Sequence, residues 1–132
     1  MKVFVSGKIG AEVAPHSFMK ELEHLGYSIT FDWTTIPHLR PYEANADESA
    51  EAAVLEIGGV TAADVLVLLS HERGVGMFVE LGAALALGKP VIAVSDIPVR
   101  TMFLFHPNVT TVADTHEAIA ALHRLRDKLA NM

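Results

Sequence analysis

Short apolar runs alternate with amphipathic segments along the chain, and this alternation sets the expected secondary structure. Runs rich in β-branched and aromatic residues predict five strands, and apolar spacings of three and four predict four helices. The expected strands are KVFVSG (2–7), YSITFDW (27–33), DVLVLLS (64–70), PVIAVS (90–95) and NVTTVA (108–113). The expected helices cover residues 11–26, 47–63, 74–88 and 115–131, with Thr115 as the cap of the last, and residues 34–45 form a loop interrupted by Pro37 and Pro41.

Strands that alternate with helices predict βαβ units around a parallel sheet. The run 64–70 is almost continuously apolar, which is typical of a strand buried on both faces. Five strands in one domain of residues 1–132 favour an α/β, flavodoxin-like or Rossmann-like doubly wound sheet of order 2-1-3-4-5 in a three-layer α/β/α arrangement. Ligands of such sheets bind beyond the carboxyl ends of the strands, which selects the loops Ser6–Gly10, Asp32–Thr35 and Ser70–Gly76.

Composition narrows the class of protein. Hydrophobic residues make up 51% of the 132 positions and charged residues 20%, as in a globular domain. The net charge of −6 argues against a nucleic-acid-binding surface. The chain has no cysteine, and its seven histidines lack any ligand spacing, so we expect neither a metal site nor a cofactor. Its apolar runs are too short for a signal peptide or a membrane span, so we expect a cytoplasmic protein that does not bind membranes.

The segment GVGMFVELGAALALGKPV (74–91) has an unusual distribution of charge. From Gly74 to Gly88, Glu80 is its one charged residue. An acidic residue early in a helix can be a solvated group that the helix dipole stabilises. The same carboxylate beside a glycine-rich turn can instead meet positive charge on a substrate, and Gly74 and Gly76 would let a ligand approach the backbone.

Several familiar nucleotide sites do not fit these residues. GVGMFV lacks the third glycine of the dinucleotide fingerprint and follows the third strand instead of the first. The chain contains no GxxxxGK[ST] phosphate loop. The carboxylates of a phosphoacceptor receiver domain are also missing from the ends of strands one and three.

The segment GMFVELGAALALGKPVIAV (76–94) resembles the central motif of the nucleoside 2-deoxyribosyltransferase superfamily, which includes the 2'-deoxynucleoside 5'-monophosphate N-hydrolases. The chain also supplies the preceding motifs of that pattern in the same order, VSGKIG (5–10) and EIGGVTAADVLVLL (56–69). The resemblance extends to about Val94. It implies that Glu80 attacks the anomeric carbon of a nucleoside or its 5'-monophosphate, and that Glu56, where the family has Asp, handles the proton of the base.

The three loops at the carboxyl ends of the strands and the resemblance together select a set of candidate substrate-binding residues around these two carboxylates. They are Ser6, Gly7, Lys8, Ile9, Asp32, Trp33, Arg73, Gly74, Gly76 and Thr101. Lys8 and Arg73 are candidates for a 5'-phosphate, although Lys8 can equally point to water. Trp33 is a candidate for stacking on the base, although a lone Trp is often part of the core. Thr101 is the candidate for a hydroxyl that a neighbouring subunit contributes.

Other functions remain open from the sequence. Hydrolysis and transfer share this mechanism and differ in whether water or a second base resolves the ester. A non-catalytic nucleotide-binding or sensory domain of the same fold is the main alternative. The cytokinin-activating phosphoribohydrolases are a weaker one, because ERGVGMFVE lacks their paired glycines. The apolar third helix and TMFLF (101–105) favour a homo-oligomer. The expected binding partner is a small-molecule nucleoside or nucleotide.

Overall fold

The computed structural model describes residues 1–71, 73–95 and 101–132. Its centre is a parallel sheet of five strands in the order β2-β1-β3-β4-β5, as the sequence predicts. The strands are β1 (Lys2–Ser6), β2 (Ser28–Ile29), β3 (Val65–Leu69), β4 (Val91–Val94) and β5 (Val109–Val112). The predicted doubly wound α/β architecture is therefore confirmed.

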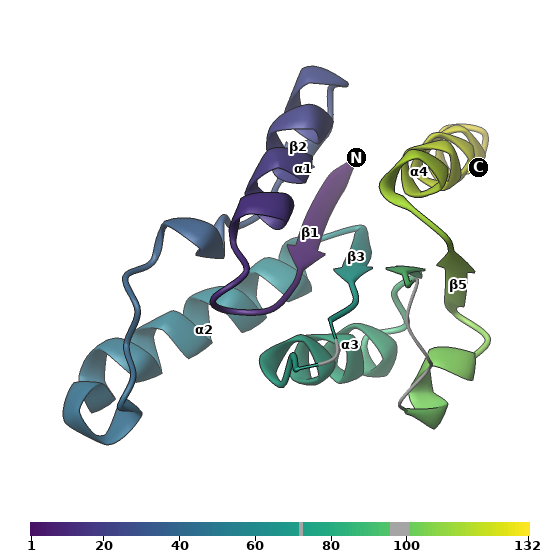
Figure 1. Ribbon diagram of the computed structural model, residues 1–132. Helices are drawn as coiled ribbons and strands as arrows, with labels where there is room; N and C mark the ends of the chain where they lie inside the picture. The colour runs from purple at the N-terminus through teal and green to yellow at the C-terminus, as the bar shows by residue number, and fades with distance from the viewer. Residues whose placement is uncertain (72, 96–100) are drawn as a thin grey trace.

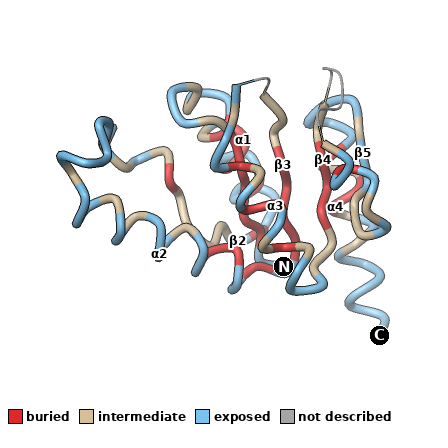
Figure 2. Tube along the Cα trace, turned by 90° about the horizontal axis from the view of Figure 1, so that it is seen from below, coloured by how far each residue is buried: buried red, intermediate tan, exposed pale blue. Residues whose placement is uncertain are grey.

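Four helices cover the two faces of the sheet. They are α1 (Val13–His24), α2 (Ala46–Ala62), α3 (Gly76–Ala86) and α4 (Thr115–Ala130). Helices α1 and α4 lie on one face, and α2 and α3 pack together on the other (Figure 1). The amino-terminal half of α2 extends beyond the sheet, together with the segment that leads into it (Figures 1 and 2).

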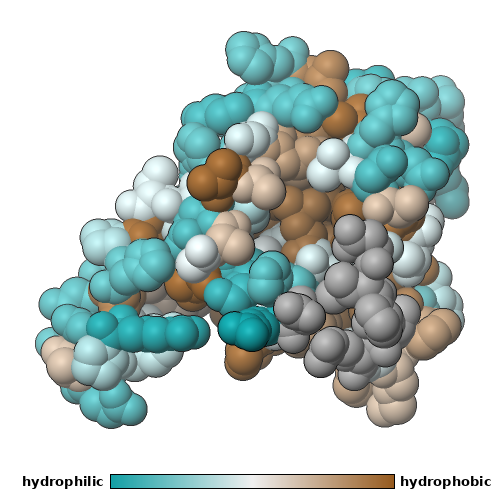
Figure 3. All heavy atoms as spheres, in the orientation of Figure 1, coloured by the Kyte–Doolittle hydropathy of each residue, from teal (hydrophilic) through white to brown (hydrophobic). Residues whose placement is uncertain are grey.

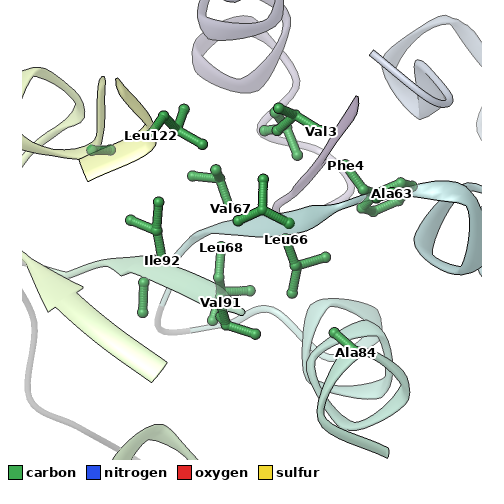
Figure 4. Packing of buried hydrophobic residues seen from close by; sticks show 14 of the residues in the cluster. Val3, Phe4, Ala63, Leu66, Val67, Leu68, Ala84, Val91, Ile92 and Leu122 are labelled. Atoms are coloured by element: carbon green, nitrogen blue, oxygen red, sulfur yellow. The ribbon is translucent and has the colours of Figure 1, made fainter. Parts of the chain in front are cut away.

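The core consists of strand side chains that alternate between the two layers of helices. Val67 and Ile92 point toward Leu122 of α4, whereas Leu68 and Val91 point toward Ala84 of α3 (Figure 4). Residue pairing is continuous across the sheet, with Val3–Ser6 of β1 opposite Val65–Leu68 of β3. Burying these apolar side chains removes them from water and fixes the carboxyl ends of β1 and β3 side by side.

Two local predictions are wrong. The strand expected over 27–33 ends at Ile29, and Trp33–Thr35 form a 3₁₀ turn, η1. The turn forms because Asp32 caps it by accepting from the backbone N–H of Thr34, and because the Trp33 indole N–H donates to the Val5 carbonyl at 2.7 Å. The cap of α4 is Asp114 instead of Thr115, since its carboxylate accepts from the backbone N–H of Glu117.

The expected loop 34–45 contains a second 3₁₀ turn, η2 (Tyr42–Asn45), directly before α2. A third, η3 (Met102–Phe105), precedes β5. Across residues 1–71, 73–95 and 101–132, the structure contains no helix with the length and apolarity that a membrane span needs.

Candidate active site

Glu80 lies inside the molecule and not on its surface. Helix α3 begins at Gly76, so Glu80 stands one turn into the helix, and its side chain is only 6% exposed. Met77 and Leu81, on the same helix, are buried beside it, whereas Val79 points to solvent. This orientation excludes a solvated first-turn carboxylate, because the helix turns Glu80 toward the carboxyl ends of β1 and β3.

Ser6 holds one oxygen of this buried carboxyl group. Ser6 is the last residue of β1 and is fully buried. Its hydroxyl donates to Oε1 of Glu80 at 2.5 Å. Since the rigid centre of the sheet carries Ser6, the bond gives Glu80 a fixed position.

Glu56 is the second carboxyl group of the site. It lies in α2, is partly buried, and contacts the Glu80 carboxyl. Burial raises the pKa of Glu80 to about 9, and a hydrogen bond and charge repulsion from Glu56 add to the increase, while the bond from Ser6 opposes it. The Glu80 carboxyl therefore carries a proton at neutral pH.

A pocket of about 230 Å³ opens beside Glu56. Two segments and one helix form its walls: the loop after β1, the connection between η1 and α2, and the face of α2 that carries Glu56. The residues that line it are Ile9, Glu12, Trp33, Ile36, Pro37, His38, Leu39, Arg40, Tyr42, Ser49, Ala52, Ala53 and Glu56. Most of this lining is apolar, so the pocket suits a flat ring that meets Glu56. Glu80 is not part of the lining and reaches the pocket only through its contact with Glu56.

Trp33 and Gly7 shape the inner end of this pocket. Trp33 is 4% exposed, and its indole N–H is already bonded to Val5, so only part of its ring faces the pocket. A Cβ on Gly7 would lie 3.0 Å from Pro15 Cγ and 3.2 Å from Trp33 Cζ2. Glycine is therefore needed where the loop passes between α1 and the indole. Trp33 thus belongs to the core and to the pocket wall at once.

Lys8, Ile9 and Asp32 differ in their relation to the pocket. Ile9 lines it, and the Lys8 ammonium group donates to the Ile9 carbonyl at 2.9 Å. Asp32 faces away from it: its carboxylate accepts from Thr34 and lies 3.3 Å from His16 Nδ1. In the described structure Asp32 holds the turn that presents Trp33, and its binding of substrate stays a prediction.

The loop before α3 contains the remaining predicted site residues except Thr101. Arg73 is exposed, and its backbone N–H donates to the ring of His71. A side chain on Gly74 would overlap Met77, which explains glycine there, whereas Gly76 at the start of α3 has open space beside it. None of the three lines the pocket beside Glu56, so their contact with substrate stays a prediction.

Thr101 lies at a different hollow of the same chain. Its hydroxyl accepts from the backbone N–H of Phe103 and caps η3. The hollow, about 130 Å³, is lined by Phe78, Leu81, Gly82, Thr101 and Phe103. Within one chain Thr101 is thus on the α3–η3 side, away from the pocket lined by Glu56, and a role in a neighbouring subunit's site stays a prediction.

Sequence reasoning missed most of the outer pocket wall. Glu12 and His38 form an ion pair at 3.0 Å between Oε1 and Nε2, which joins the loop after β1 to the segment before α2. The backbone N–H of Gly10 also donates to Glu12, and this bond lowers the pKa of that carboxyl. Arg40 lies over the Tyr42 ring, 5.8 Å from its centre. The segment before α2 has no hydrophobic periodicity. Its two prolines predicted a loop, but no feature of its sequence predicted that it forms a pocket wall.

Metal binding finds no support in the part of the chain that the structure describes. There, no group of three or more His, Asp or Glu side chains is arranged to hold an ion.

Comparison with known proteins supports the fold and not a sequence relationship. No protein-family model and no curated protein matches the chain. The structure of a CMP N-glycosidase, BcmB, from Clostridium botulinum aligns with it at a TM-score of 0.60, over 93% of this chain and 99% of that one, with 15% sequence identity. The chain therefore shares the fold of this N-glycosidase.

Proposed function

We propose that this protein cleaves the N-glycosidic bond of a nucleoside or nucleoside 5'-monophosphate through a covalent glycosyl ester on Glu80. The observation that carries the proposal is the buried Glu80 carboxyl, bonded to Ser6 and in contact with Glu56 beside an apolar pocket. The structural likeness to a CMP N-glycosidase supports the same reaction class.

Glu80 has the properties of a nucleophile that acts in a dry site. A carboxylate with little water around it interacts strongly with positive charge that develops on an anomeric carbon. Contact between the two carboxyl groups also favours the covalent route, because a route by direct water attack keeps them about 6.5–9.5 Å apart to hold that water.

Glu56 is the proposed acid. Burial holds the pKa of Glu80 far above its usual range, so this group carries a proton before the reaction. The first proposed step transfers that proton to the Glu56 carboxylate, which leaves Glu80 ionised as the nucleophile and makes Glu56 the acid.

The reaction then proceeds in two balanced steps. An oxygen of Glu80 forms a bond to C1', the C1'–N bond breaks, and the base takes its electron pair together with the proton of Glu56. Water next attacks C1', gives a proton to Glu56, and releases the sugar and the Glu80 carboxylate. If a second base takes the place of water, the same ester yields a new nucleoside.

The proposal is tested by incubating the protein with ribo- and deoxyribonucleosides and their 5'-monophosphates. Free base is measured by chromatography, and addition of a second base tests transfer. We expect release by the wild type and a loss of about 10³-fold or more in Glu80→Gln. Glu51→Gln, at an exposed position of α2, is the matched control and keeps wild-type activity.

Acid quenching followed by peptide mass analysis locates the ester. A glycosyl adduct on Glu80 is the expected result. An adduct on another residue contradicts the mechanism. Tight binding of one panel member without release of base favours a nucleotide-binding or sensory domain in place of an enzyme.

A further inference from the structure

Ser6 and Glu80 form an unusual pair in the core. Among the residues that the structure describes, these two are the buried polar side chains, and each bonds to the other. The three residues directly before Ser6 in β1 are Val3, Phe4 and Val5, all fully buried and apolar. Burying a hydroxyl at the end of such a strand costs free energy unless the hydroxyl is hydrogen-bonded, as that of Ser6 is to Glu80.

The bond from Ser6 acts on the charge of Glu80. A hydroxyl that donates to a carboxylate stabilises its ionised form, and it opposes burial and the neighbouring Glu56 carboxyl, which both favour the neutral form. The hydrogen bond from Ser6 also occupies one lone pair of Glu80 Oε1. Nucleophilic attack by Glu80 therefore uses one of the other lone pairs of its carboxylate.

The position of the donor is fixed by the sheet. Ser6 is paired with Leu68 in the continuous register of β1 and β3, and the core packs against both strands. The hydroxyl therefore reaches Glu80 without reorganisation of the backbone, which is the condition for an effective electrostatic contribution.

We infer that Ser6 is a positioning residue that orients Glu80 and favours the ionised form in which it acts as a nucleophile, a role that rests on the proposed function. This role differs from substrate binding, because the buried Ser6 hydroxyl donates its one proton to Glu80 at the end of β1.

The test compares Ser6→Ala and Ser6→Cys with the wild type, with Ser28→Ala on the exposed edge strand β2 as the control. Cysteine keeps the volume but donates weakly, so it stands between serine and alanine. For Ser6→Ala we expect kcat at neutral pH to fall about 10- to 100-fold with little change in KM, and partial recovery at higher pH. Ser6→Cys is expected to lie between the two, and Ser28→Ala to match the wild type.

A second measurement does not depend on activity. Carbon-13 NMR of labelled glutamate carboxyls follows the titration of Glu80, identified by its absence in Glu80→Gln. We expect the midpoint to rise by about one to two pH units in Ser6→Ala. An unchanged midpoint overturns the inference, and so does a raised KM with unchanged kcat, which is the signature of substrate binding.

The two proposals fail in different ways. If the wild type releases no base, the proposed function fails, while the NMR midpoint still tests the bond from Ser6 to Glu80. Thermal melting of each variant shows whether it is folded, and Ser6→Cys carries the comparison if the alanine variant is not.

Discussion

Two carboxyl groups in contact in a site with little water carry less negative charge at neutral pH than the same two groups carry in water. Glu80 and Glu56 are such a pair, and burial together with the neighbouring Glu56 carboxyl raises the pKa of Glu80. This property provides an acid and a nucleophile from two residues of the same type. It also makes both activity and stability depend on pH.

Glu56 carries the first prediction at this scale. Glu56→Gln removes the charge repulsion that raises the pKa of Glu80, so the Glu80 midpoint falls, while base release drops about 10²- to 10⁴-fold because the proton donor is lost. Glu56→Asp, which restores the family residue, keeps measurable activity. Carbon-13 titration and base release are measured on both variants, and a Glu56→Gln enzyme as fast as the wild type rules out the acid role.

Glu80 carries a prediction on stability. In the unfolded chain its pKa is near 4.5, and in the folded protein it is about 9. Between these values the native state binds more protons than the unfolded state, so the free energy of unfolding falls as pH rises, by at most about 1.4 kcal/mol per pH unit. Urea unfolding at pH 5, 6, 7 and 8 measures this slope. Glu80→Gln is expected to remove it, and an equal slope in both proteins contradicts the assignment.

At the residue scale the sequence selected the two carboxyl groups that the structure brings together, but not the residues around them. The charge distribution along 74–88 drew attention to Glu80, and the family resemblance added Glu56. The bond from Ser6 to Glu80 joins residues 74 positions apart, and no local pattern encodes it. Likewise, nothing in the spacing of Glu12 and His38 shows that they meet across the pocket rim.

At the scale of elements, α2 connects the core to the site. Its buried end packs Gly59 against Phe4 and Phe31, and its opposite end carries the pocket wall. The elements themselves were predictable, because runs such as 64–70 and the amphipathic helices have clear periods. The strand expected over 27–33 was not, because a long-range bond from Trp33 to Val5 overrides its β propensity.

The adjacent glycines of α2 provide a matched pair of variants. A Cβ on Gly59 would lie 2.9 Å from side-chain atoms of Phe4 and Phe31, whereas Gly58 has nothing within 4 Å. Gly59→Ala is expected to lose about 1–3 kcal/mol of unfolding free energy, since the clash outweighs the gain in helix propensity. Gly58→Ala is expected to gain up to about 1 kcal/mol. Urea unfolding measures both, and equal effects at the two positions disprove the packing argument.

At the scale of the whole molecule, one face remains apolar. The single charged residue of α3 is buried, so the exposed side of this helix presents only uncharged groups, among them Val79 at 62% exposure. Met102, Phe103 and Phe105 of η3 are also exposed, and apolar atoms gather at the lower right of the space-filling view, where η3 lies (Figure 3). A patch of this kind is typical of a protein–protein interface.

We therefore expect this chain to associate with copies of itself through the α3–η3 face. Val79→Lys places a charge in the patch and is expected to shift the molecular mass measured by light scattering toward that of the monomer. Val54→Lys, on the exposed side of α2, is the control for a general effect of added charge. A monomeric wild type, or dissociation by Val54→Lys alone, contradicts this assignment of the interface.

The pocket wall that lies outside the sheet can vary in sequence independently of the two carboxyl groups. Glu80, Ser6 and Glu56 stand on α3, β1 and α2, whereas residues 36–40 and 42 line the pocket from the connection between η1 and α2. Replacing that short segment would therefore alter the shape of the pocket and leave the Glu80–Ser6–Glu56 cluster in place. If the proposed function holds, a library randomised over residues 36–42 is the direct route to variants that act on other bases.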